Sequence, residues 1–175
     1  MEALVVYESI FGNTHQIADQ IANGLRPTMD VTLTAVGNLT AEMLAAADLV
    51  VVGGPTHAHS MSRASTRADG IRRAELPDSE LRVDPDAEDP GLREWFETEP
   101  EGHGIRAAAF DTRVDMNPAI SGRASKGIAK RLGHHGFTMV TEPESFLVSR
   151  DDRLVVGEAA RARTWATTLA QFVTV

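Results

Sequence analysis

The sequence predicts a doubly wound α/β domain, with helices on both faces of a parallel sheet, on the basis of three observations. Apolar segments of strand length alternate along the chain with segments of helical periodicity, as in proteins built from strand–helix–strand units. Two of the apolar segments, 2–7 and 48–54, are continuous rather than alternating runs, which is typical of parallel strands covered on both faces. Crossovers between parallel strands are right-handed, so the helices must pack back onto the sheet.

Five strands are predicted from the apolar segments. Four of them lie at 2–7, 30–36, 48–54 and 105–110. The fifth lies within 137–148, where Pro143 interrupts it, because proline cannot donate a hydrogen bond to a neighbouring strand.

Three helices are predicted between and after these strands, from apolar residues that recur every three or four positions. They span 14–25, 119–133 and 157–173. The apolar stripes consist of Ile17, Ile21 and Leu25 in the first helix, Ile120, Ala124, Ile128 and Leu132 in the second, and Ala162, Trp165, Leu169 and Phe172 in the third.

One segment does not follow the alternation. Residues 84–101 carry eight acidic side chains against the single Arg93. We expect an exposed excursion with a short helix around 90–98, whose inward face is formed by Leu92, Trp95 and Phe96. The acidic side chains either are simply solvated or form a surface for a partner. The whole chain, 1–175, is otherwise expected to form one domain, since no linker or internal repeat is present.

Composition excludes several classes of function. The formal net charge is −8, whereas a general nucleic-acid binder needs concentrated basic residues. The absence of cysteine excludes disulfides, thiol catalysis and thiolate metal sites. No apolar run approaches the ~20 residues of a membrane-spanning helix, and the N-terminus does not resemble a secretory signal. A cytoplasmic location is therefore the simplest expectation.

Three polar segments follow predicted strands, at 8–15, 53–62 and 111–119. Ligands of open parallel sheets bind beyond the carboxyl ends of the strands, so these segments are candidates for one site. In the first, hydroxyl and amide side chains surround Gly12, directly before a helix start whose free N–H groups attract anions. No Lys or Arg occurs within 1–25, which favours one phosphomonoester over a di- or triphosphate. The alternative is an ordinary helix cap by Asn13 or Thr14.

These segments resemble the flavodoxin family. "VVYESIFGNTHQIADQIANGL" is similar to its phosphate loop, a hydroxyl residue followed after a short gap by Gly-Asn-Thr; "LVVVGGPTHAHSMS" is similar to its second flavin loop, and "AAAFDTR" lies where the third should begin. The resemblance implies a five-stranded sheet of order 2-1-3-4-5 that binds flavin mononucleotide (FMN) at its edge.

The resemblance also assigns site residues. It places the FMN phosphate among Ser9, Ile10, Phe11, Gly12, Asn13 and Thr14. It places one side of the flavin ring against Pro55, Thr56, His57, Ala58 and His59, and the other side against Asp111, Thr112 and Arg113. No residue is assigned a catalytic role.

Several of these residues have other interpretations. His57 and His59 are flavin contacts, metal ligands or plain loop residues; no third metal ligand stands near them, so no metal site is predicted. The segment 111–113 either binds the pyrimidine edge of the flavin or forms a local turn. The basic side chains that follow the second loop form a solvated helix face or a site for a nucleotide such as NADPH; these are Arg63, Arg67, Arg72 and Arg73.

The expected function is electron transfer by bound FMN, with a redox partner protein or an NAD(P)H-dependent reductase as partner and the oligomeric state open. The flavin loops lack the aromatic residues that usually cover the ring, and an open ring favours an FMN-dependent quinone reductase in which His57 or His59 supplies a proton. A cofactor-free binding or regulatory module is the third hypothesis.

Overall fold

The computed structural model describes residues 1–173, so that positions 174–175 of the predicted domain lie outside the described residues. Its sheet contains β2 (Asp30–Ala35), β1 (Glu2–Tyr7), β3 (Leu49–His57), β5 (Arg106–Val114) and β6 (Thr138–Met139) in that order. β7 (Glu144–Val148) also pairs with β5, and all these pairs are parallel. The predicted order 2-1-3-4-5 is confirmed, with the fifth strand in two pieces, β6 and β7, on either side of Pro143. The short β4 (Ser60–Met61) pairs antiparallel with β3.

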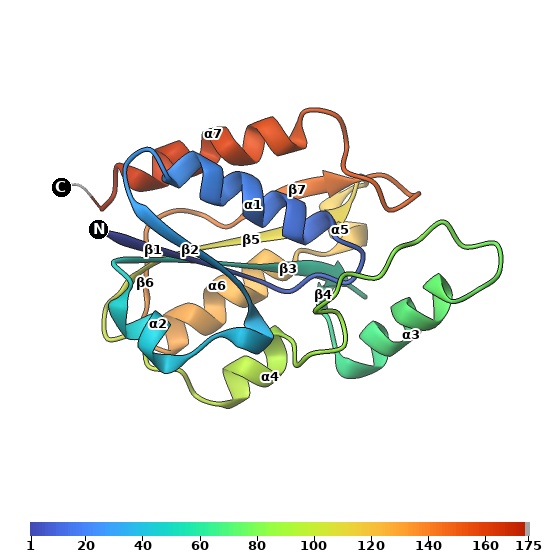
Figure 1. Ribbon diagram of the computed structural model, residues 1–175, viewed down its shortest axis with the longest axis horizontal. Helices are drawn as coiled ribbons and strands as arrows, with labels where there is room; N and C mark the ends of the chain where they lie inside the picture. Colours follow the sequence, from blue (N-terminus) through green and yellow to red (C-terminus); the bar gives the residue numbers. More distant parts are fainter. Residues whose placement is uncertain (174–175) are drawn as a thin grey trace.

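Helices cover both faces of the sheet, as predicted (Figure 1). α1 (Asn13–Leu25) and α7 (Glu158–Ala170) lie on one face, and α2 (Ala41–Ala46), α4 (Leu92–Glu97) and α6 (Ala124–His134) on the other. α3 (Ala64–Ala74) extends beyond the carboxyl ends of the strands, to the right in Figure 1. A 3-10 turn (Val36–Asn38) and the one-turn α5 (Pro118–Ser121) complete the helical elements described. None of the helices within 1–173 is long and apolar enough to cross a membrane.

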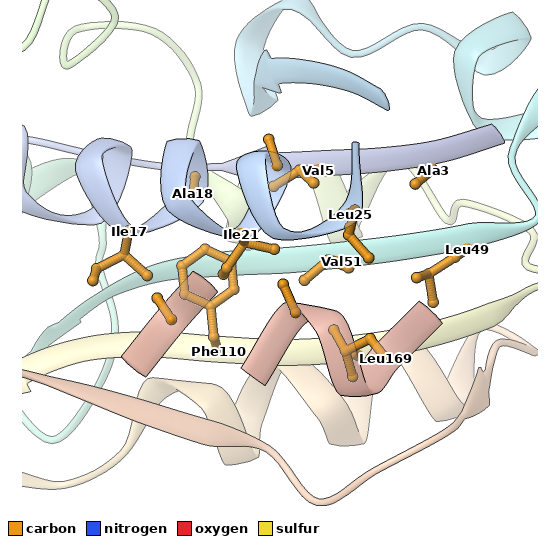
Figure 2. Packing of buried hydrophobic residues seen from close by; sticks show 14 of the residues in the cluster. Ala3, Val5, Ile17, Ala18, Ile21, Leu25, Leu49, Val51, Phe110 and Leu169 are labelled. Atoms are coloured by element: carbon orange, nitrogen blue, oxygen red, sulfur yellow. The ribbon is translucent and has the colours of Figure 1, made fainter. Parts of the chain in front are cut away.

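Two apolar clusters form the core, one on each face of the sheet. Alternate residues of β1 belong to different clusters: Val5 packs with α1 and α7, whereas Val6 packs with α2, α4 and α6. In Figure 2 the predicted stripe of α1 points at the sheet, where Phe110 belongs to the same cluster. A Cβ on Gly53 would lie 2.1 Å from Cζ of Phe110. The Phe110 ring therefore fills the core above Gly53 and is unable to cover a flavin.

Two helices of the structure differ from the predicted helices in where they begin or end. The second begins at Ala124 rather than at 119, because Gly122, at φ +76°, separates the α5 turn from α6. Ile120 is consequently 63% exposed instead of joining the apolar stripe. The third helix ends at Ala170, and Phe172 beyond it is 46% exposed.

The acidic segment 84–101 packs onto the domain at its first residue, Asp84, and through α4, which is the short helix predicted around 90–98. The N–H of Asp84 donates to the carbonyl of Ile10 at 2.7 Å, and Asp84 is buried. Leu92 and Phe96 of α4 are buried in the core, with Trp95 partly buried beside them. The segment therefore joins the carboxyl end of β1 to the face that α4 covers.

Candidate functional site

The carboxyl ends of β1, β3, β5 and β7 surround a cavity of about 60 Å³. It brings together most of the residues predicted from the three loops: Ser9, Ile10, Phe11, Asn13, Thr14, Pro55, Thr56, His57, Thr112 and Arg113. The rule that ligand sites form beyond the carboxyl ends of parallel strands explains this convergence.

The loop 9–14 is shaped around Gly12, the residue directly before α1. Gly12 has φ +86°, which glycine adopts without strain, and its N–H donates to Oγ of Ser9 at 3.0 Å. Within residues 1–173, the N–H groups of Asn13, Thr14 and His15 have no acceptor, and no side chain caps the helix. These three donors and the positive end of the helix dipole suit an anion.

Side chains of the same loop connect it to two other segments. Oγ1 of Thr14 and Oγ1 of Thr112 lie 2.7 Å apart, and both residues are buried. Because this hydrogen bond uses one of the two hydroxyl hydrogens, the other is free to donate to a ligand. Nδ2 of Asn13 donates to the carbonyl of Asp152 at 2.8 Å, which ties the loop after β7 to the loop after β1.

The second predicted loop is a β-hairpin formed by β3 and β4. Ala58 and His59 form its exposed tip with φ +46° and +71°, and they do not line the cavity. His59 instead makes a parallel bridge to Gly122. Oγ1 of Thr56 accepts the N–H of Ala124 at 2.9 Å, so this side chain caps α6.

The third predicted loop is the end of β5, and its residues alternate between two sides. Asp111 is fully buried on the side of α6, where Oδ2 accepts the N–H of Ser125 at 2.7 Å. Burial raises the pKa of the Asp111 carboxyl above its ordinary value, despite the opposing effect of this hydrogen bond. Thr112 faces Thr14, whereas Nη1 of Arg113 donates to the carbonyl of Met116 at 2.8 Å. Of the segment 111–113, Thr112 and Arg113 line the cavity and Asp111 caps α6.

Among the predicted residues that line the cavity, His57 is the one whose pKa departs from its ordinary value. Burial lowers the pKa of His57 below its ordinary value, and the charges of Arg73 and Arg67 lower it further. At neutral pH the ring is therefore uncharged and presents one N–H donor and one acceptor nitrogen.

We expect proton NMR of the histidine rings to give His57 a pKa below 6.5, with Arg73→Gln raising it. The resonance is assigned with His57→Gln, and Arg63→Gln is the control. Since the unfolded state binds this proton at about pH 6.5 and the native state at a lower pH, the contribution of His57 to stability is lost on acidification below about 6.5. An unshifted pKa in the wild type, or a pKa indifferent to Arg73, would contradict the assignment.

A buried polar network supports the site from below. Glu8, directly after β1, accepts hydrogen bonds from Oγ of Ser62 and, at 2.8 Å, from the N–H of Leu92. Nη1 of Arg67 lies 3.2 Å from the same Ser62 Oγ, and its Nη2 lies 3.2 Å from Oε2 of Glu94. The network thus joins the end of β1, the start of α3 and the start of α4.

Three residues of the cavity wall were not predicted: Val114, Val148 and Asp152. Val148 and Asp152 belong to the end of β7 and the loop after it. The rule applied to the other strand ends also points to the end of the fifth strand, so this signal was present in the sequence. Near the loop 9–14 the structure adds Asp84, whose Oδ2 lies 3.0 Å from Nδ1 of His15. No group of three His, Asp or Glu side chains within 1–173 is arranged to hold a metal ion.

The residues present fit the phosphate end of FMN better than its ring end. Three free N–H groups and two hydroxyls form the phosphate end, whereas the adjoining cavity of about 60 Å³ is far below the ~300–1,000 Å³ typical of ligand pockets. The cavity in this form therefore does not enclose a whole flavin ring.

Comparison with known proteins agrees with this architecture. Residues 4–67 match the family model described as flavodoxin domain. No curated protein sequence matches the chain. Among solved structures, a flavodoxin from the domain Archaea is similar with a TM-score of 0.66 and 19% identity, covering 100% of both chains.

Two further structures illustrate the range of similar proteins. Flavodoxin 1 from Bacillus cereus has a TM-score of 0.66 and 16% identity over 98% of each chain. A flavodoxin, WrbA-like protein from Agrobacterium tumefaciens has a TM-score of 0.63 and 20% identity, over 99% of this chain and 97% of that one. These findings confirm the resemblance to the flavodoxin family. The similarity in fold extends over the whole chain, and the similarity in sequence pattern covers residues 4–67.

Proposed function

We propose that the chain binds FMN non-covalently and takes part in electron transfer. The observation that carries the proposal is the loop 9–14, where three unpaired N–H groups at the start of α1 stand beside the hydroxyls of Thr14 and Thr112. This set of neutral donors suits one phosphate group, and such groups bind at helix N-termini. The family match over 4–67 contains this loop.

Each part of the site has a distinct task in this proposal. The N–H groups of Asn13, Thr14 and His15 would hold the phosphate. Pro55, His57 and Arg113, which line the adjoining cavity, would border the ring. Bound flavin supplies one- and two-electron transfer, and the protein orients it and adjusts its potential.

FMN titration with the purified protein tests the proposal directly. We expect FMN fluorescence to be quenched on binding, and a two-banded flavin absorbance if the cofactor is retained through purification. Riboflavin, which lacks the phosphate, should bind at least roughly tenfold more weakly, because hydrogen bonds to a charged group contribute ~1.5–3 kcal/mol each. Absence of quenching with both ligands would contradict the proposal and favour the cofactor-free module.

An FMN-dependent NAD(P)H:quinone-type oxidoreductase is the second candidate function. Two observations favour it: Phe110 lies in the core rather than over the ring, and a WrbA-like protein is among the similar structures. Steady-state NADPH oxidation in the presence of a quinone separates the candidates. Turnover supports the enzyme, whereas reduction by a flavodoxin reductase without such turnover supports the carrier.

A further inference from the structure

A second cavity, of about 400 Å³, adjoins the first. Phe11 and Asp152 line both, so the two cavities are neighbours at the carboxyl end of the sheet. The lining of the second cavity includes four arginines, which we call the arginine cleft: Arg73, Arg82, Arg150 and Arg153. Residues 1–25 contain no Lys or Arg, so the loop 9–14 has no basic side chain of its own for a second phosphate. The fold supplies positive charge from distant parts of the chain.

The arginine cleft is formed by two segments that are held together. Arg73 and Arg82 come from the end of α3 and the loop after it, whereas Arg150 and Arg153 come from the loop between β7 and α7. Nη2 of Arg73 lies 3.6 Å from Oδ2 of Asp152, and Nη2 of Arg153 lies 3.2 Å from Oε2 of Glu80. The backbone carbonyl of Asp152 also accepts from Asn13, so the cleft is fixed to the loop 9–14.

Two of the four guanidinium groups have no partner among residues 1–173. Neither Arg82 nor Arg150 forms an ion pair or a side-chain hydrogen bond within that range. The cleft as a whole has four arginines against three carboxylates, those of Glu80, Asp151 and Asp152, on a chain whose net charge is −8. A local excess of positive charge on an acidic protein is suited to an anionic ligand.

We infer that the arginine cleft binds phosphate of a dinucleotide, beside the phosphate that the loop 9–14 holds; the position of that first phosphate rests on the proposed function. A guanidinium group donates to two phosphate oxygens at once and remains charged at every physiological pH. The phosphate in the cleft has two possible sources: the second phosphate of a flavin dinucleotide whose first phosphate lies in the loop, or the diphosphate of a nicotinamide dinucleotide that delivers electrons.

Calorimetric titration of the flavin-free protein with inorganic pyrophosphate tests the cleft without any flavin. The variant is the double substitution Arg82→Gln and Arg150→Gln, at two exposed positions. The matched control, Arg63→Gln with Arg72→Gln, removes the same charge from exposed positions outside the cleft. We expect the double variant to bind pyrophosphate at least roughly tenfold more weakly than the wild type, with the control close to the wild type. Equal binding by variant and control would overturn the inference.

Two further titrations identify the source of the phosphate in the cleft. If it belongs to a flavin dinucleotide, FAD binds the wild type more tightly than FMN, and the double variant loses this preference. If it belongs to a nicotinamide dinucleotide, FAD shows no preference, and NADP⁺ binds the FMN-loaded double variant more weakly than the FMN-loaded wild type. A double variant that binds both dinucleotides as tightly as the wild type does would refute the inference. If FMN does not bind the wild type but pyrophosphate does, only the proposed function is refuted.

Discussion

Arg67→Met is expected to lower the free energy of unfolding by about 2 kcal/mol, because it leaves the partly buried carboxylate of Glu94 and the buried hydroxyl of Ser62 without their hydrogen-bond donor. Arg67 is 7% exposed, and its guanidinium lies between Ser62, which bonds Glu8, and the carboxylate of Glu94. The substitution removes the cation next to Glu94 and one of the two partners of the Ser62 hydroxyl, which in turn bonds Glu8. For a chain of this size the loss corresponds to a decrease in Tm of roughly 4–8 °C.

The matched control is Arg72→Met on the same helix. Arg72 pairs with Asp69, but its side chain is 71% exposed, and an exposed pair contributes about 0–1 kcal/mol. Denaturant unfolding of both variants measures the difference. Equal stability of the two would show that the network around Glu8 is not a determinant of stability.

The effect of Arg67→Met should also depend on pH. Burial acts to raise the pKa of Glu94, but the hydrogen bond from Arg67 and bonds from backbone N–H groups outweigh it, so the pKa lies below its ordinary value of 4.5. A carboxyl with a lowered pKa stabilises the native state above its unfolded pKa and loses this contribution as pH falls through the native pKa. The difference between wild type and variant is therefore expected to shrink below about pH 4.5.

Gly12→Val is expected to weaken FMN binding about 100-fold while leaving riboflavin affinity within a factor of about three. Gly12 has φ +86°, and a non-glycine residue in this conformation costs ~1–3 kcal/mol and is relieved by rotation of the backbone. Valine is particularly unfavourable because it is β-branched. Rotation at Gly12 redirects the N–H groups at the start of α1 and removes about two charge-assisted hydrogen bonds, which is equivalent to roughly 100-fold in affinity.

Gly104→Val serves as the control for backbone strain. Gly104 has φ +82° and no atom within 4 Å of the position of a new Cβ, and it lies before β5, at the amino end of that strand. The control should lose stability in a similar way without affecting either ligand. Equal losses of FMN and riboflavin affinity in Gly12→Val would refute the assignment of the loop 9–14 to the phosphate.

The fold was predictable because burial determines which positions of a strand or helix are apolar, and these positions show which face of the element packs against the rest of the domain. Continuous apolar runs at β1 and β3 are buried on both faces by two clusters, and the periodicity of α1 identifies its buried face directly. The start of α6 was predicted too early in the chain because Ile120 and Ala124 fit one helical stripe. That stripe contains no information on the φ of Gly122, which separates the two turns.

The geometry of the candidate site was predictable only where one short segment determines it. The loop 9–14 carries its own turn, its own glycine and its own helix start. The partners of Thr56 and Asp111, in contrast, are backbone N–H groups at the start of α6, and the arginine cleft combines residues about 70 positions apart in the chain. Side chains with several available partners select one through the tertiary fold, and a single sequence does not contain that choice.

The cap that Thr56 forms on α6 affects how easily the site opens. Oγ1 of Thr56 holds the N–H of Ala124 at the start of this helix, and Thr56 belongs to the hairpin that borders the small cavity. A helix cap contributes about 1 kcal/mol, so a form in which the hairpin moves outward and releases this cap lies about 1 kcal/mol above the closed one. Roughly 15% of molecules would then be open before ligand arrives, and the apparent affinity of a ligand that needs the open form would be lower than its intrinsic affinity by the same factor. The start of α6 would therefore influence the binding of a ligand that it does not contact.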